Sequence, residues 1–533
     1  KNYSPSTIKP STTIGKVRSM TNLSMSAPSA ATVIPSWDDI AAKSIGTSVG
    51  SALEQEVKSR QQGKGSAHVQ NTLRLFDSNE TPKITLYRDH AGWCPYCQKT
   101  MLLIEEKEIP IKIGLVPMRS YGDKPREFLQ KVPNGLLPAI EVDIGNGKPQ
   151  VITESQVIME LLDQWHPPSA GYKPMLPEEN DQAGNSRVQE LARLERELFS
   201  WWCTLLFRPE GPRMGGNVFD MLKGNSGGGQ MSGAMTGFLD CMKKVDAALS
   251  STPGPWFFDK DHPTMIDFIY VSHVERMLAS CAYWKGLNLR DPKWNFKGLV
   301  AWLEAFEKRE NYVAFKSDYY THVMDIPPQY GPGYDGGFEE DRAKFSKSIQ
   351  GRDGAWSLPL PHDDPLQPLF RGPPLPLAVL ESMGLEPDAD GTYESCDKNA
   401  MSKACRYMAG WKLAGNGSKV ARFASRGGPK GAANPRKSFG AELADPYAEA
   451  DNNVEPYVDV ALRMVCMALL GDSATPDDSL AANLKASIPQ DQTTGVVSSL
   501  AYLRDRVGVP RDLPLASGRQ LRAYLNWAID VLA

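Results

Sequence analysis

Two cysteines stand three positions apart where the sequence changes from a strand pattern to a helical one. Residues 83–89 (KITLYRD) alternate in polarity and are rich in β-formers, which predicts a strand. Residues 98–108 (QKTMLLIEEKE) predict a helix with apolar side chains to bury. Between them lies WCPYC, whose Pro95 suits the first position of a helix. Cys94 is therefore expected at the N-terminus of that helix.

The segments that follow complete a small α/β unit. Residues 109–116 predict a strand and residues 124–132 a short helix. Residues 137–143 predict another strand, which pairs with 147–153 as a hairpin across Gly145-Asn146-Gly147. Residues 154–165 predict an amphipathic helix. This order is that of a thioredoxin-like domain, which we place at residues 80–168.

The position of the two cysteines favours redox chemistry. Exposed amides and the dipole at a helix N-terminus favour the thiolate of Cys94, and Lys99 adds positive potential one turn later. Cys97 is placed to attack a mixed disulfide on Cys94 and release the product. A zinc site would need a second ligand pair, which the other cysteines and the seven histidines do not offer at suitable spacing, so no metal is expected. Two buried structural thiols remain an alternative.

Composition sets the wider limits. A chain of 533 residues is too long for one hydrophobic core. No run of about 18 apolar residues predicts a membrane-spanning helix. Apart from Cys94 and Cys97 the eight cysteines are scattered singly, which is typical of a reducing compartment rather than a disulfide framework. The net charge of −4 says little about partners.

The WCPYC motif matches that of glutaredoxins, and the segments around it resemble a glutathione transferase. DKPREFLQKVPNGLLPAIE (123–141) and VITESQVIMELLD (151–163) match this family in order and spacing. The similarity is strongest to the cysteine-type classes, namely omega, lambda and the dehydroascorbate reductases. It covers about residues 80–325 and implies a thioredoxin-like domain followed by an all-α C-terminal domain at 175–325.

The resemblance also implies a glutathione site. Pro138 corresponds to the family's cis-proline, and the backbone of Leu137 would then pair with the cysteinyl part of glutathione. Glu154 and Ser155 correspond to the pair that holds the γ-glutamyl group of glutathione. Ser155 would bind the carboxylate of that group, and Glu154 would bind its ammonium. Lys124 takes the place of the lysine that meets the glycine carboxylate. Each residue alone could equally be a helix cap or a solvated charge.

The helical segment offers one functional candidate, a pair of tryptophans, beside a structural helix cap and a Gly-rich stretch. Trp201 and Trp202 are candidates for a second-substrate pocket, although aromatic residues at helical spacing are more often core. Thr264 and Asp267 precede an apolar run with the spacing of a capping box. The Gly-rich stretch 211–234 is predicted to be an inserted loop.

The N-terminal extension, residues 1–79, combines a transit-like start with a helical patch at 38–60. Residues 1–37 contain four bases, many hydroxyl side chains and no acid, a composition typical of organellar transit regions. Residues 25–36 resemble the junctions of algal plastid proteins. The sequence therefore predicts a plastid location, with an ordinary tail and a cytoplasmic location as the alternative.

The C-terminal region, residues 340–533, resembles no family and is predicted to be mainly helical. A linker at 326–340 precedes it, and seven prolines fall between Pro359 and Pro376. Residues 398–441 hold ten bases and no acid, whereas 442–460 hold six acids and no base. The two segments could neutralise each other; a protein partner or a peripheral membrane surface is an alternative, and nucleic acid is less favoured.

Two functions follow from these expectations. The first is a glutathione-dependent thiol–disulfide oxidoreductase that acts through Cys94, with glutathione as cosubstrate and a small oxidant or a glutathionylated protein as partner. A cysteine at this position forms a mixed disulfide with glutathione, so reduction or deglutathionylation is favoured over conjugation. The second is a structural subunit of a large plastid complex, built on the same fold with residues 340–533 as the partner surface.

Overall fold

The computed structural model describes residues 34–143, 149–209, 231–431 and 442–533. Within it, Pro35–Ala533 form one compact unit. The transit-like residues up to 33, the Gly145–Gly147 turn, most of the Gly-rich stretch and the end of the basic segment lie outside the described residues.

The sheet has the predicted thioredoxin-like order and one additional strand. Its strands run β1-β3-β2-β4-β5 across the sheet, and only β2 and β3 are parallel. Their bounds are Leu73–Arg74 (β1), Ile84–Asp89 (β2), Ile111–Val116 (β3), Ala139–Val142 (β4) and Gln150–Thr153 (β5). The helices of this unit are Pro95–Lys107 (α3), Arg126–Lys131 (α4) and Ser155–Trp165 (α5). The extra edge strand β1 comes from the N-terminal extension, where no strand was predicted.

The helical segment is built around α9, whose side chains are almost all buried. Its elements are α6 (Gln182–Leu206), α8 (Gly233–Leu249), α9 (Met265–Lys285), α10 (Lys297–Glu307), α11 (Glu310–Val313) and α12 (Tyr319–Tyr330). The predicted capping box is confirmed at the start of α9, where the backbone N–H and hydroxyl of Thr264 both donate to Asp267. Asp267 also accepts a hydrogen bond of 2.9 Å from Trp302, so the cap ties α9 to α10.

The prediction of a linker from residue 326 is wrong for its first five residues. Helix α12 continues to Tyr330 even though it contains Pro327 and Pro328. Local sequence disfavours helix at this point because proline removes a donor and restricts the residue before it. Tertiary packing overrides that preference, since Ile326 is completely buried and Asp325 accepts a hydrogen bond from Tyr121 of the α/β unit.

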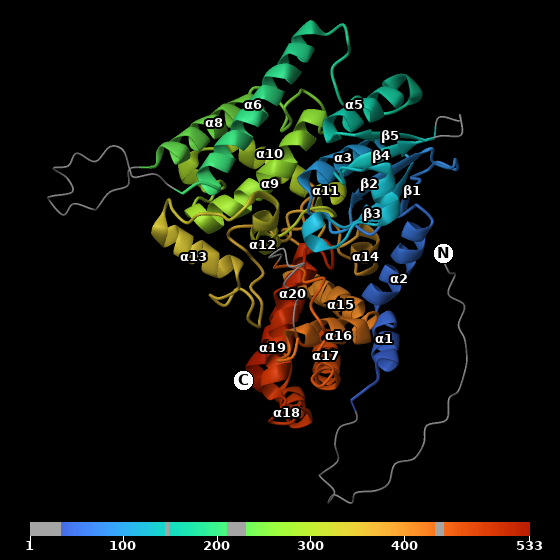
Figure 1. Ribbon diagram of the computed structural model, residues 1–533, viewed down its shortest axis with the longest axis vertical. Helices are drawn as coiled ribbons and strands as arrows, with labels where there is room; N and C mark the ends of the chain where they lie inside the picture. Colours follow the sequence, from blue (N-terminus) through green and yellow to red (C-terminus); the bar gives the residue numbers. More distant parts are fainter. Residues whose placement is uncertain (1–33, 144–148, 210–230, 432–441) are drawn as a thin grey trace, which may run out of the picture. The chain divides into compact units, whose positions relative to one another are not determined.

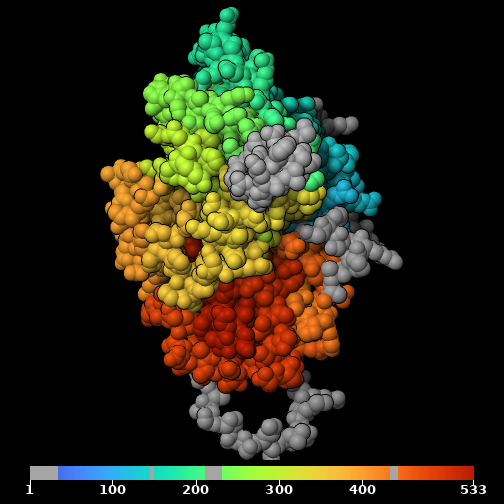
Figure 2. All heavy atoms as spheres, turned by 90° about the vertical axis from the view of Figure 1, so that its left-hand side faces the viewer, coloured from blue at the N-terminus to red at the C-terminus, as the bar shows by residue number. Residues whose placement is uncertain are grey.

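The C-terminal region is helical, as predicted. Its elements are α13 (Glu339–Ile349), α14 (Leu377–Ser382), α15 (Lys398–Ala414), α16 (Gly417–Ala424), α17 (Glu455–Leu469), α18 (Asp478–Ser487), α19 (Thr493–Arg504) and α20 (Leu515–Leu532). Figure 2 shows the red and orange segments of this region forming a continuous surface with the yellow segment that precedes them in the chain. A buried ion pair between Asp318 at the start of α12 and Arg522 of α20 joins the two regions.

The predicted helical patch of the N-terminal extension forms two helices, α1 (Trp37–Ile45) and α2 (Ser48–Gln61). They lie beside the C-terminal helices, with α1 against α15 and α17 and α2 against α14 and α15 (Figure 1). The Trp37 indole donates a hydrogen bond of 2.6 Å to Asp459, and Trp411 donates one of 2.9 Å to Glu54. These two helices are thus an integral part of the compact unit.

The basic segment has ion-pair partners within the fold. Arg422 pairs with Glu455 at 3.1 Å, which is one case of the predicted neutralisation by residues 442–460. Lys398 and Lys403 pair instead with Asp363 and Asp472, outside that acidic segment. In the described part of the chain, no helix combines the length and the apolar character needed to cross a membrane.

Candidate active site

The WCPYC motif begins where β2 ends and α3 starts. The Asp89 carboxylate accepts a hydrogen bond of 2.7 Å from the backbone N–H of Trp93 and thereby fixes the loop. Cys94 is the N-cap residue of α3 and Pro95 its first residue, as expected. The Cys94 side chain is buried, and its thiol faces the backbone carbonyl of Leu137 at 4.0 Å. The Leu137–Pro138 peptide is cis, as the sequence predicted.

Cys97 lies one turn further along α3, behind Cys94. It is only 1% exposed. Burial raises the pKa of the Cys97 thiol well above its ordinary value, and its contact with Cys94 raises it further. Because the thiolate is the attacking form of a cysteine, Cys97 is held as a weak nucleophile in this arrangement.

Two lysines bring positive charge to the cysteines. Burial lowers the pKa of Lys99 to about 8, and the nearby charges of Glu195, Cys94 and Glu154 oppose that shift. Burial also lowers the pKa of Lys124, against the opposing charges of Cys97 and Cys94. The Lys124 ammonium donates to the carbonyl of Pro117 at 2.8 Å. The structure therefore gathers Cys94, Lys99 and Lys124 in one electrostatic environment.

Glu154 and Ser155 lie at the start of α5, where the backbone is strained. Glu154 has φ +70° and ψ 108°, a conformation that non-glycine residues rarely adopt. Strain of this kind costs about 1–3 kcal/mol and is concentrated at functional sites. Ser155 is the first residue of α5 and is buried, whereas the Glu154 side chain is exposed. The free amides of this helix start suit a carboxylate.

The tryptophans predicted for the second-substrate pocket lie in helix packing. Trp202 is completely buried and donates a hydrogen bond of 3.0 Å to Ser280 of α9. Trp201 lies against Gly237 of α8, where a Cβ atom would come within 2.6 Å of its ring.

Tyr96 of the motif has aromatic neighbours from other elements. The centroid of the Tyr96 ring lies 5.5 Å from that of the His273 ring, and the centroid of the Phe199 ring lies 5.0 Å from it. Burial raises the pKa of Tyr330 well above its ordinary value, and the charges of Tyr96 and Cys94 add to that shift. The Tyr330 hydroxyl is buried without a hydrogen-bond partner in the described structure. Sequence reasoning missed Tyr330 because it stands in the stretch predicted to be a linker.

A charged group on α6 borders the same area. Glu195 accepts hydrogen bonds from Arg196 and from Nδ1 of His273. Burial alone would raise the pKa of Glu195, but these two partners outweigh burial and lower the pKa to about 2. Arg196 keeps its guanidinium half-exposed on the side of Lys99 and Tyr96.

Residues from α9 and from the C-terminal region bind Trp93 and Gln98, in and beside the motif. No local sequence pattern predicted these contacts. Arg276 of α9 is completely buried and donates to the Trp93 carbonyl and to Gln98 of α3. From the C-terminal region, the Val509 carbonyl accepts a hydrogen bond of 3.0 Å from the Trp93 indole, and Arg511 stacks 4.7 Å above the Trp93 ring. Only the folded chain brings residues so distant in sequence together.

Comparison with known proteins agrees with the fold of this site. Residues 93–165 match the family model described as glutathione S-transferase, N-terminal domain. Glutathione S-transferase DHAR2 of Arabidopsis thaliana is 37% identical over 79 residues, which are 15% of this chain and 33% of that relative. Pyrimidodiazepine synthase of Drosophila melanogaster is 26% identical over 223 residues, 42% of this chain and 77% of that protein. The chain thus spans only a third of the length of the first of these relatives.

Among solved structures, glutathione transferase Omega 3C of Trametes versicolor is similar, with 18% identity and a TM-score of 0.32, covering 45% of this chain and 91% of that one. The sheet order, the position of Cys94 at the start of α3 and the family match over residues 93–165 agree with one another. Residues 93–165 of this chain are therefore similar to the N-terminal domain of glutathione S-transferases, and Cys94 lies at the start of the first helix in that segment.

Proposed function

We propose that this protein is a glutathione-dependent thiol–disulfide oxidoreductase whose nucleophile is Cys94. The observation that carries the proposal is the position of Cys94 as N-cap of α3, facing the carbonyl of Leu137 beside the cis-proline. The free amides at the start of α3 and the ammonium groups of Lys99 and Lys124 bring positive potential to the Cys94 sulfur.

The proposed reaction proceeds in two exchanges. The Cys94 thiolate attacks the glutathionyl sulfur of a mixed disulfide, forms a Cys94–glutathione disulfide and releases the substrate thiolate, which takes a proton from water. A glutathione thiolate then attacks the glutathionyl sulfur on Cys94, which gives glutathione disulfide and regenerates the Cys94 thiolate. Each turnover thus consumes one free glutathione and converts the mixed disulfide into the substrate thiol and glutathione disulfide.

Cys97 offers a second route for the second step, by attack on the Cys94 sulfur. Its complete burial and raised pKa support the route through a second glutathione instead. We therefore assign Cys97 no obligatory part in turnover.

The glutathione would be held by the residues at the start of α5 and by the loop before β4. In this proposal Ser155 and the amides of α5 bind the γ-glutamyl carboxylate, and Glu154 binds the ammonium group. The backbone of Leu137 pairs with the cysteinyl unit, and Lys124 meets the glycine carboxylate. The strained backbone of Glu154 supports this assignment, because strain of this kind is concentrated at functional sites.

The decisive test is an assay for glutathione-dependent reduction of the mixed disulfide of glutathione and 2-mercaptoethanol. We expect Cys94→Ser to lower the rate at least about 100-fold, and Cys97→Ser to change it by less than about threefold. Ser155→Ala should raise the KM for glutathione about tenfold. Ser479→Ala, an exposed serine of α18, is the control. An inactive wild type that also forms no glutathione adduct on Cys94 by mass spectrometry would exclude the proposal.

A structural role in a larger complex is the second candidate. Its support is that α1, α2 and the whole C-terminal region pack into one unit with the glutathione transferase part. Co-purification with a larger assembly at fixed stoichiometry, combined with an inactive wild type, would favour this role. The plastid location depends on residues 1–37, most of which lie outside the described residues, and it stays a prediction to be tested by imaging a fluorescent fusion.

A further inference from the structure

A cavity of about 490 Å³ lies between the helical segment and the C-terminal region, away from Cys94. One wall comes from α9 and α12, and the other from the turn after α13, the end of α19 and α20. Its volume is within the range of small-molecule sites, which form preferentially between structural units. The family match at residues 93–165 includes none of its lining residues.

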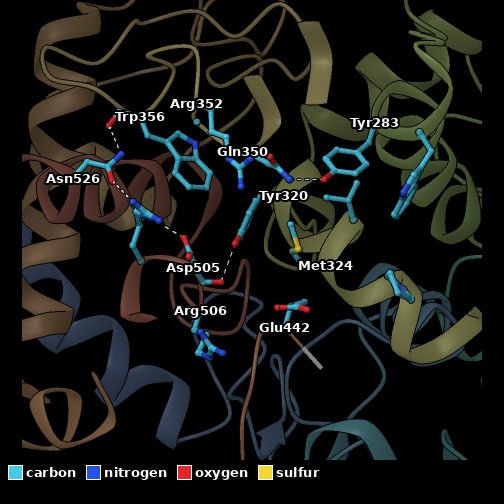
Figure 3. A pocket seen from close by; sticks show the side chains of 15 residues that line it. Tyr283, Tyr320, Met324, Gln350, Arg352, Trp356, Glu442, Asp505, Arg506 and Asn526 are labelled. Carbon is cyan, nitrogen blue, oxygen red and sulfur yellow. Dashed lines mark hydrogen bonds and ion pairs between the residues drawn. The ribbon is translucent and has the colours of Figure 1, made fainter. Parts of the chain in front are cut away.

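Aromatic rings form much of its wall. Tyr283 and Trp284 meet edge to face with centroids 4.9 Å apart, and Tyr320 and Trp356 do so at 5.0 Å. Figure 3 shows Tyr283, Tyr320 and Trp356 around an open space, with Met324 beside Tyr320. Such rings present flat apolar surfaces, which favour a planar aromatic ligand.

The wall is held in place by hydrogen bonds before any ligand arrives. Gln350 donates to the Tyr283 hydroxyl, and the Tyr320 hydroxyl donates to the Asp505 carbonyl at 3.1 Å. The Asn526 side chain donates to the Trp356 carbonyl at 3.1 Å. A wall ordered in this way loses little side-chain entropy on binding.

The charges that line the cavity are not balanced. Arg504 pairs with Asp505 at 2.8 Å. That leaves the guanidinium groups of Arg352 and Arg506 against the single carboxylate of Glu442, and neither arginine has an ion pair among the described residues. The Nε of Arg506 is also buried without a hydrogen-bond partner in that part of the chain. Figure 3 shows Arg352 on one side of the cavity and Arg506 with Glu442 on the other.

From these observations we propose that the cavity binds a planar aromatic anion, with its rings against Tyr283, Tyr320 and Trp356 and its acidic group on Arg352, while Arg506 on the other side adds to the positive potential of the cavity. A guanidinium group recognises a carboxylate or sulfonate through paired hydrogen bonds. The site goes beyond the proposed redox function, because it uses neither cysteine of the motif and depends on the C-terminal region.

The test uses 8-anilinonaphthalene-1-sulfonate, an aromatic sulfonate, titrated into the full chain by calorimetry and fluorescence. We expect one binding site that saturating glutathione leaves unchanged. Arg352→Gln and Arg506→Gln should each weaken binding about tenfold, and Glu442→Gln should tighten it. Arg193→Gln, an exposed arginine of α6, should have no effect.

Two further measurements keep the result interpretable. Met324→Trp fills the cavity without changing its charge and should abolish binding, whereas N-phenyl-1-naphthylamine, which lacks the sulfonate, should bind with the same affinity to wild type and Arg352→Gln. Thermal melting of every variant shows whether the fold is intact. The proposal is overturned if the sulfonate binds folded Arg352→Gln, Arg506→Gln and Met324→Trp as tightly as wild type, if glutathione displaces it, or if the wild type does not bind it.

Discussion

The indole nitrogen of Trp93 donates a hydrogen bond of 3.0 Å to the backbone carbonyl of Val509, 416 residues further along the chain. Trp93 immediately precedes the proposed nucleophile, and Val509 belongs to the loop between α19 and α20. The hydroxyl of Ser317 donates to the same carbonyl at 2.6 Å. One carbonyl of the C-terminal region therefore joins the motif loop to the segment before α12.

Trp93→Phe tests the energetic weight of this link. The substitution removes the indole donor and part of a completely buried ring, so we expect the free energy of unfolding to fall by about 1–3 kcal/mol. The measurement is urea-induced unfolding followed by circular dichroism. Trp294→Phe is the control, since the Trp294 indole nitrogen is buried without a hydrogen-bond partner among the described residues. Equal losses in the two variants would contradict the prediction.

Arg522→Met tests the second junction between the two regions. Arg522 is completely buried, pairs with Asp318 and donates to the Val507 carbonyl at 2.6 Å. Without Arg522, the buried Asp318 carboxylate has lost its ion-pair partner. We therefore expect the unfolding free energy to fall by about 3–5 kcal/mol. Arg342→Met, which breaks the more exposed pair with Asp335, should cost less than about 1 kcal/mol. A comparable, small loss in both variants would refute this account of the junction.

Lys99→Met tests the cost of a buried ammonium group at the site. Burial lowers the pKa of Lys99 from 10.5 to about 8. Between pH 8 and pH 10.5, Lys99 therefore keeps its proton in the unfolded chain but has lost it in the folded protein. The stability contributed by this group is therefore present above pH 10.5 and is lost as the pH falls through 8. We expect the unfolding free energy of Lys99→Met, measured with urea at pH 7, to exceed that of wild type by about 3 kcal/mol. This difference should shrink toward pH 10.

Lys64→Met, at an exposed position, serves as the control for Lys99→Met. A stabilisation by Lys99→Met that did not depend on pH would argue against the titration as its cause. The same variant should reduce glutathione-dependent activity, because it removes a positive charge from beside Cys94.

Asp325→Asn tests a buried carboxyl group between α12 and the α/β unit. Burial raises the pKa of Asp325 to about 7, although the hydrogen bond from Tyr121 acts in the opposite direction. Because this pKa is raised from 3.8, the stability that Asp325 contributes is complete below pH 3.8 and is lost as the pH rises through 7.

Asp325→Asn should therefore gain stability relative to wild type between pH 5 and pH 8, as measured by thermal melting. The expected change is about 2 kcal/mol or more. Asp335→Asn, at an exposed carboxylate, should follow wild type at both pH values. A melting difference between Asp325→Asn and wild type that is equal at the two pH values would count against the raised pKa.

Local pattern was enough to predict the elements that carry the candidate site. Alternating polarity predicted β2, Pro95 predicted the start of α3, and the spacing of Thr264 and Asp267 predicted the cap of α9. The cis peptide before Pro138 was implied by the resemblance to glutathione transferases. These features depend on neighbours within a few residues, so the information they need is contiguous in the chain.

The surroundings of the site were decided by tertiary structure alone. Trp202 became core because α9 offers it Ser280, and α12 passed through two prolines because Ile326 and Asp325 are held by distant partners. The cavity around Trp356 exists only because α12 and α20 meet. Contacts of this kind join residues 78 to 204 positions apart and leave no local pattern. The sequence by itself therefore determined the thiol motif and its fold, and only the folded chain decided what encloses them.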